Sequence, residues 1–200
     1  MNSRIRAVRI TRARGFTLME LMMTIAILVI LVTLAVPSFN QFIQNNRLAG
    51  QANEMVSALQ YARSEALKRG SWVELCASAN QTTCGGDLND GWIVHADPAF
   101  LEPGETNPLR AWATPSDKIA VAAVQNSARF MASGCIDHDE DGDCSAHFDP
   151  GAGDDETPFL RVAENPDLAE IEPRQVRISP TGRVTACRQD PGDSAKCKTT

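Results

Sequence analysis

The chain has 200 residues, enough for one domain with an extension. Apolar residues make up 43% of the sequence and charged residues 22%, which excludes a disordered chain and a membrane protein with several spans. The formal charge of −6 excludes a protein that coats nucleic acid over its whole surface, although a local basic patch is compatible with it.

The charge is distributed unevenly along the chain. The first fifteen residues carry five arginines and no acidic residue. Residues 16–173 carry a net charge of −15, and residues 174–200 carry +4. These three zones each need a separate explanation.

The first predicted element is an apolar helix over residues 16–36, which read FTLMELMMTIAILVILVTLAV. At a rise of 1.5 Å per residue, such a helix spans roughly 30 Å, the thickness of a hydrocarbon core. The preceding arginines favour a cytoplasmic amino terminus, so we expect the rest of the chain to be exported. The alternative is a cleaved secretory signal peptide, but its apolar region is usually shorter and lacks a buried acid such as Glu20.

The sequence GFTLME at residues 15–20 follows a basic leader and resembles the type III signal of type IV prepilins and pseudopilins. The resemblance implies cleavage between Gly15 and Phe16 by a prepilin peptidase, and methylation of the new amino terminus at Phe16. Pro37 matches a proline that is common in these proteins.

The resemblance also implies a role for Glu20 in assembly, in which its carboxylate neutralises the terminal amine of a neighbouring subunit. Two charges that are each costly in lipid are tolerated when they are paired. In an alternative interpretation, Glu20 merely reaches the membrane interface, because it lies one turn from the cleavage point.

The helix is predicted to continue through Pro37 to residue 69. Apolar residues at spacings of four and three form one stripe along it, namely Leu48, Ala52, Met55, Leu59, Ala62 and Ala66. We expect this stripe to pack under a globular head, a local kink at Pro37 and a helix end at Gly70.

Further segments resemble the GspH/FimT family of minor pseudopilins and minor pilins. They are LQYARSEA at residues 59–66, VELC at 73–76, DGWIV at 90–94 and SPTGR at 179–183, the last resembling the family's P-x-G-R turn. The resemblance implies an α+β, type IV pilin-like fold with a long amino-terminal helix packed on a β-sandwich-like head. The expected organisation is a cleaved leader at 1–15, a transmembrane segment at 16–36, an amphipathic continuation at 37–69 and the head at 70–200.

Short runs of β-favouring residues, separated by Pro, Gly, Asn and Asp, predict the strands of the head. These runs cover residues 72–77, 91–96, 119–124, 159–163, 175–178 and 183–187.

Six cysteines suit an exported domain, and they allow fifteen pairings. Because sequence neighbours lie 8, 9 and 10 residues apart, we predict local disulfides. The predicted pairs are Cys76–Cys84, Cys135–Cys144 and Cys187–Cys197.

An acidic segment offers the clearest metal-binding pattern. Asp137, Asp139, Asp141 and Asp143 alternate around Gly142, as in the first half of a calcium loop. Phe148 occupies the twelfth position, where an EF-hand has glutamate, so a solvated acidic hairpin tip is the stronger interpretation and Ca²⁺ the alternative. The ligand types Cys135, His138, Cys144 and His147 would also suit zinc, but an oxidising compartment favours the disulfide.

The sequence contains no catalytic constellation, and we expect a non-enzyme with no cofactor beyond the Ca²⁺ alternative. His95, within a predicted strand, is interpreted as structural. The basic tail, with Arg183, Arg188, Lys196 and Lys198, suggests either a surface for acidic faces of neighbouring subunits or DNA binding. A Gly-Arg region of this kind is associated with DNA capture in the FimT branch.

We therefore expect a minor pilin of a type IV pilus, located at or near the tip and involved in priming assembly. The alternatives are a GspH-type pseudopilin of a type II secretion system and a DNA-binding minor pilin for natural transformation. The expected partners are other pilins or pseudopilins, prepilin peptidase and the bacterial inner membrane, which the chain spans once with its carboxyl terminus in the periplasm before it enters the filament.

Overall fold

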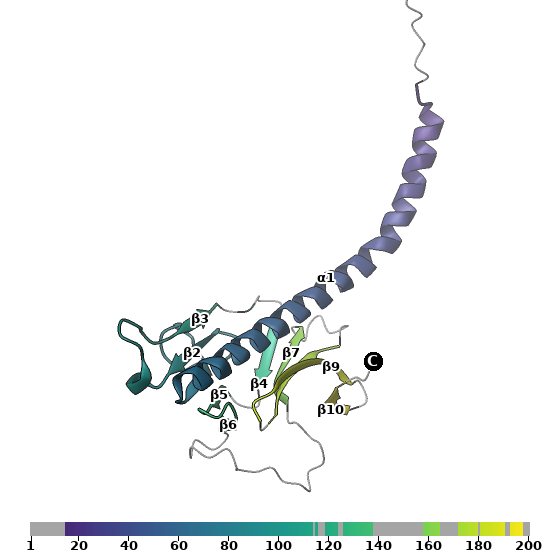
Figure 1. The fold of residues 1–200 in the computed structure, drawn as a ribbon. Coiled ribbons are helices and arrows are strands. Elements are labelled where there is room, and N and C mark those ends of the chain that lie inside the picture. The colour runs from purple at the N-terminus through teal and green to yellow at the C-terminus, as the bar shows by residue number, and fades with distance from the viewer. Residues whose placement is uncertain are drawn as a thin grey trace, which may run out of the picture. The chain divides into compact units, whose positions relative to one another are not determined.

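A computed structural model describes the protein at residues 15–113, 115, 119–123, 126–137, 158–164, 172–179, 181–190 and 193–197 (Figure 1). The chain divides into two compact units, Met1–Phe42 and Ile43–Thr200, and each is described by itself.

One helix, α1 (Leu18–Arg69), is the longest element and belongs to both units. It continues through Pro37 without a break in its helical assignment. Gly70 ends it with a φ of +66°, and its N–H donates to the Ala66 carbonyl at 3.0 Å. Lys68 and Arg69 lie in the last turn, where positive charge suits the helix dipole.

In the second unit, α1 buries the apolar stripe that the spacing predicts. All six predicted residues are buried, and Ala58, which was not predicted, is buried with them; the full set is Leu48, Ala52, Met55, Ala58, Leu59, Ala62 and Ala66. Four of these residues are alanines, so the helix backbone can approach the sheets closely.

The head contains two antiparallel sheets of five strands each. The first sheet has the order β3-β2-β1-β5-β6. Its strands are β1 (Val73–Ala77), β2 (Trp92–Ala96), β3 (Arg110–Trp112), β5 (Ser127–Phe130) and β6 (Ile136–Asp137). A 3-10 turn, η1 (Pro98–Phe100), follows β2.

The second sheet has the order β10-β9-β8-β7-β4. Its strands are β4 (Ile119–Ala123), β7 (Pro158–Glu164), β8 (Arg174–Ile178), β9 (Val184–Asp190) and β10 (Asp193–Cys197). Each of the six predicted strands is present, whereas β3, β5, β6 and β10 were not predicted. The class is α+β, as expected.

Both sheets share one apolar core with α1. Alternate residues of β1 and β2 face that core, including Val73, Leu75, Trp92 and Val94, which are fully buried. Val176 of β8 joins the same cluster from the second sheet. Because strand side chains alternate in direction, Glu74, Cys76 and His95 must lie on the opposite face of the first sheet.

Truncation of the core stripe should destabilise the head. Leu59 is fully buried, so Leu59→Ala is expected to lower the free energy of unfolding by about 2–4 kcal/mol. Leu67, which is 50% exposed on the same helix, is the matched control, and Leu67→Ala should cost less than about 1 kcal/mol. Denaturant unfolding of the full chain in detergent, followed by the fluorescence of Trp72, Trp92 and Trp112, measures both; equal losses would contradict this packing.

Candidate functional site

The amino-terminal end of α1 is organised around Thr17. Its hydroxyl accepts a hydrogen bond from the Glu20 N–H at 3.2 Å, and its carbonyl accepts one from the Leu21 N–H at 3.1 Å. Thr17 is therefore the N-cap, and Glu20 falls at the third helical position, which is the T-x-x-E spacing of a capping box. A carboxylate in the first turn is also favoured by the helix dipole.

Beyond that turn, the helix presents apolar side chains on every side. The large apolar residues of segment 16–42 are all about half exposed or more in the isolated chain, from Phe16 at 83% to Val32 at 48%. By length and composition, this part of α1 can cross a membrane.

The hydroxyl groups of Thr24 and Thr33 are satisfied within the helix. Thr24 donates to the Leu21 carbonyl and Thr33 to the Ile30 carbonyl, both at 2.8 Å. Such bonds remove the cost of placing a hydroxyl in an apolar environment. Among the described residues of 16–36, Glu20 is the one ionisable side chain.

Arg63, from the YARSEA sequence of α1, connects the two sheets. Its Nε donates to the Gly134 carbonyl at 2.8 Å, in the turn between β5 and β6. Its Nη2 donates to the Thr181 carbonyl at 3.0 Å, in the turn between β8 and β9. The two sequences that resemble the family in separate parts of the chain thus meet at one guanidinium.

Gly182 allows the turn between β8 and β9 to approach the turn between β5 and β6 closely. Its φ of +74° lies in the left-handed region, and a Cβ at this position would lie 1.9 Å from the Gly134 carbonyl oxygen. Ser179 closes the same turn, since its carbonyl accepts from the Gly182 N–H at 2.7 Å and its hydroxyl from the Arg183 N–H at 3.0 Å. Only glycine fits here without displacing the neighbouring turn.

A second arginine holds the loop that follows β2. Arg69 pairs with Glu65 at 2.8 Å and with Glu105 at 2.7 Å, and it also donates to the Phe100 carbonyl. The hydrogen bonds from Arg69 lower the pKa of Glu105 to about 2. Ion pairs of Arg69 therefore hold the loop against the end of α1.

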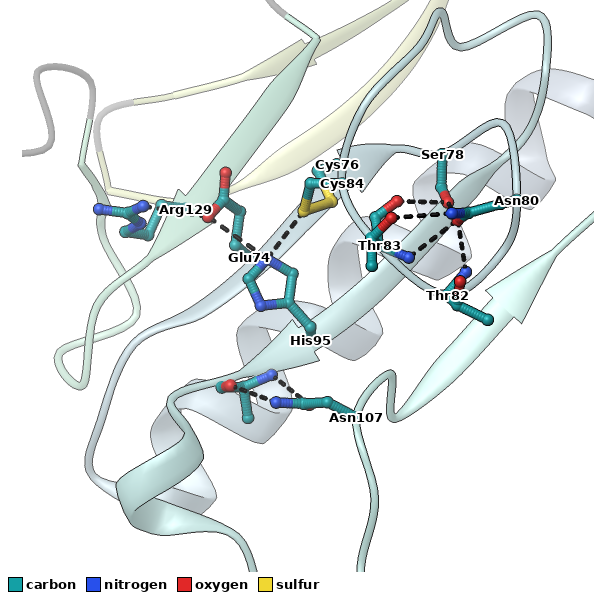
Figure 2. Close-up of a disulfide and its surroundings, with 11 residues drawn as sticks. Glu74, Cys76, Ser78, Asn80, Thr82, Thr83, Cys84, His95, Asn107 and Arg129 are labelled. Carbon is teal, nitrogen blue, oxygen red and sulfur yellow. Dashed lines mark hydrogen bonds and ion pairs between the residues drawn. A yellow bond between two sulfur atoms is a disulfide. The ribbon is translucent and has the colours of Figure 1, made fainter.

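A row of ionisable residues crosses the outer face of the first sheet. The strand register places His95 opposite Glu74, Glu74 opposite Arg129, and Arg129 opposite Asp137. The Glu74 carboxylate lies 3.1 Å from Arg129 Nη2 and 3.5 Å from His95 Nε2 (Figure 2). Burial raises the pKa of Glu74, but the hydrogen bonds from His95 and Arg129 outweigh it and lower the pKa to about 2.

The cysteine predictions fall partly within the described residues. Cys76 and Cys84 form a disulfide, as predicted. Cys135 and Cys187 are also disulfide-bonded, whereas Cys144 and the side chain of Cys197 lie outside the described part. The Cys76 and Cys84 sulfurs and a His95 nitrogen lie within 4.8 Å of one another, but the disulfide removes both sulfurs as metal ligands.

Other predicted site residues are only partly described. Asp137 is buried at the end of β6, and Asp139, Asp141 and Asp143 lie outside the described residues, as do His138 and His147. Arg183 is exposed in the turn before β9, and Arg188 is exposed on β9; Lys196 lies on β10, and Lys198 lies outside the described residues. The Ca²⁺ and DNA predictions therefore stay predictions.

The contacts made by Arg63 and Arg129 were not predicted from the sequence. Gly134 and Thr181, the partners of Arg63, lie 71 and 118 residues away in the chain, and Glu74, the partner of Arg129, lies 55 residues away, so no local spacing reveals these contacts. The resemblance of YARSEA and SPTGR to one family was the only available signal, and it indicated the segments without showing that they touch.

A family model described as type II transport protein GspH matches residues 51–182, and a model of the prokaryotic N-terminal methylation motif matches residues 10–36. Two crystal structures of the type IV minor pilin FimU from Pseudomonas aeruginosa align with 80% and 76% of this chain and 98% of their own. They are 21% and 19% identical, with TM-scores of 0.47 and 0.44. No curated protein matches.

The contact at Gly182 predicts a strong effect of one methyl group. Gly182→Ala adds both the left-handed backbone cost and a collision with the Gly134 carbonyl, so it should lower the free energy of unfolding by more than about 2 kcal/mol. Gly70 has a similar φ of +66° but open space around it, so Gly70→Ala should cost only about 1 kcal/mol. Denaturant unfolding compares the two, and a smaller loss at Gly182 than at Gly70 would refute the close approach.

The lowered pKa of Glu74 predicts acid sensitivity. An unfolded glutamate titrates near about 4.3, so the stability that Glu74 contributes is complete above that pH and is lost as the pH falls towards about 2. Relative to the wild type, Glu74→Gln should be less stable by about 1–3 kcal/mol at pH 7, and the difference should disappear near pH 2.

The control is Glu102→Gln, because the Glu102 side chain is 63% exposed and lies 3.7 Å from Lys68. It should follow the wild-type curve at every pH. If the Glu74→Gln and wild-type curves stay parallel from pH 7 to pH 2, the proposed charge interactions are absent.

Proposed function

The chain belongs to the GspH family and carries the N-terminal methylation motif, which makes it a structural subunit of a pilus or pseudopilus; beyond this, we propose that it is a minor pilin of a type IV pilus. In this proposal it has no enzymatic activity, takes its place at or near the pilus tip and helps to prime assembly.

The observation that carries the proposal is the exposed apolar helix with one acid in its first turn. Burying the apolar side chains of residues 16–36 in a bilayer, and later among the helices of a filament, removes them from water. Glu20 alone opposes both steps, because a carboxylate is costly in an apolar environment. A cationic amino terminus on a neighbouring subunit offsets that cost.

The same proposal sets the location and processing of the chain. The basic leader stays in the cytoplasm, residues 16–36 span the inner membrane and the head lies in the periplasm. Prepilin peptidase cuts between Gly15 and Phe16, and the new Phe16 amine is methylated. Other pilins then bind through the exposed helix.

The alternative is a GspH-type pseudopilin of a type II secretion system, because the same helix chemistry serves both filaments. The abundant disulfides and the acidic segment of the head lead us to favour the pilus. Deletion of the gene decides between them: loss of surface pili and of pilus-driven movement with normal secretion supports the pilus. Normal pili, together with a failure to secrete enzymes that are normally extracellular, would contradict the assignment to the pilus.

A second candidate function is DNA binding for natural transformation. Arg174 and Arg188 lie directly opposite each other across β8 and β9, and Arg183 is exposed nearby in sequence. Burial and the charge of Arg188 lower the pKa of Arg174, so a bound anion would relieve this repulsion. A gel-shift assay with the full chain at low salt tests it, and no retardation at high micromolar protein removes this candidate.

Substitution of Glu20 tests the assembly role. Glu20→Ala should be processed normally but reach sheared filaments at a level at least about tenfold below wild type, because the neighbouring amine is left without its partner. Glu54→Ala, an exposed glutamate farther along α1, is the control and should assemble normally. Mass spectrometry of the mature amino terminus and of filament fractions measures both effects; wild-type incorporation of Glu20→Ala would refute the role.

A further inference from the structure

The Cys76–Cys84 disulfide joins one buried sulfur to one exposed residue. Cys76 lies on β1 and is 3% exposed. Cys84 is exposed in the loop of residues 78–91 that connects β1 to β2. A reagent from solution therefore meets Cys84 first, since exposure is one of the factors that control thiol reactivity.

His95 is positioned against the exposed cysteine. Its Nε2 lies 3.0 Å from Cys84 Sγ, and in Figure 2 the contacts from Cys84 and Glu74 meet at the same end of the ring. The Glu74 carboxylate lies 3.5 Å from the same Nε2, and the ring of Trp72 packs edge-on against the imidazole, with centroids 5.6 Å apart. Arg129 fixes Glu74 in turn at 3.1 Å.

The loop that carries Cys84 is closed by hydrogen bonds that do not involve sulfur. Gly85 donates to the Ala77 carbonyl and accepts from the Ala79 N–H, both at 2.9 Å. The Asn80 side chain accepts from the N–H groups of Thr82 and Thr83 at 2.9 Å, and the Ser78 hydroxyl donates to the Thr83 carbonyl at 2.7 Å. These bonds bring the two cysteines together before they are joined, which raises their effective concentration.

From this geometry we propose that Cys76, Cys84 and His95 form a thiol-oxidation site. In it, the Cys84 thiol attacks the disulfide of an external oxidant, and His95 acts as the general base for Cys84. The external substrate is a disulfide-bearing oxidant, either a small molecule or a thiol–disulfide oxidase. The inference does not depend on which filament the chain enters.

The reaction has two exchange steps. In the reduced protein, a neutral His95 with its proton on Nδ1 leaves Nε2 free to accept. The Cys84 thiol gives its proton to this Nε2 while its sulfur attacks one sulfur of the oxidant, and the departing thiolate takes that proton. The imidazolium formed between these two transfers donates from Nε2 to the Glu74 carboxylate. The Cys76 thiolate, whose proton goes to solvent, then attacks Cys84 Sγ and expels the second oxidant thiolate, which is protonated from solvent. The protein dithiol is oxidised to the disulfide, and the oxidant disulfide is reduced to two thiols.

The test uses oxidised glutathione and the full chain in detergent, reduced and then freed of reductant. Cys76→Ser traps the mixed disulfide at Cys84, and Cys84→Ser is the matched variant that leaves Cys76. Samples are quenched with acid and alkylated, and peptide masses report each cysteine separately. We expect Cys84 to be glutathionylated at least about tenfold faster than Cys76.

His95→Gln then separates a chemical role from a structural one. It should slow the reaction of Cys84 by at least about tenfold and leave the reaction of Cys76 unchanged, whereas simple loosening of the loop would accelerate Cys76. In concentrated guanidinium the two cysteines should react at similar rates, and His95→Gln should have no effect. Equal rates for Cys76 and Cys84 in native buffer, or a normal Cys84 rate in His95→Gln, would overturn the proposal.

Discussion

One continuous helix has to satisfy two different environments, and the rest of the structure depends on how its sequence changes along its length. Residues 16–36 are apolar on every side except at Glu20. The hydroxyl groups of Thr24 and Thr33 donate to backbone carbonyls of the same helix. From Leu48 onwards, only one stripe is apolar, and it is narrow because small alanines alternate with Leu48, Met55 and Leu59. The first pattern suits lipid or other helices, and the second suits the face of a sheet.

Polar contacts add to the packing of this apolar stripe in attaching the sheets to α1. The Arg63 guanidinium bonds one turn of each sheet, and Gly182 lets those turns approach each other without a clash. Arg69 fastens the loop after β2 to the end of the same helix. The backbone carbonyls of Gly134 and Thr181 thus acquire charged donors, which give stronger hydrogen bonds than neutral ones. The helix is the common support for both sheets.

The features of this fold that depend on local spacing could be predicted from the sequence, whereas the contacts between distant segments could not. The stripe from Leu48 to Ala66 and the end of α1 at Gly70 follow from local spacing and capping chemistry, as does the Cys76–Cys84 pair. The strands β3 and β6 were missed because three and two residues show no periodicity. The row of His95, Glu74 and Arg129 was also missed, because it exists only once three strands are in register. His95 was interpreted as structural, and its contact with Cys84 required the fold of the intervening loop.

The central claim is that the Glu20 carboxylate meets the amino terminus of a neighbouring subunit, and zero-length chemical cross-linking tests it most directly. A membrane-soluble carbodiimide applied to intact filaments converts an ion pair of this kind into an amide without adding atoms. The account predicts a cross-linked peptide pair that joins Glu20 to the amino-terminal residue of another subunit. Filaments that contain the chain but yield Glu20 only as the free acid or the reagent adduct would contradict the account.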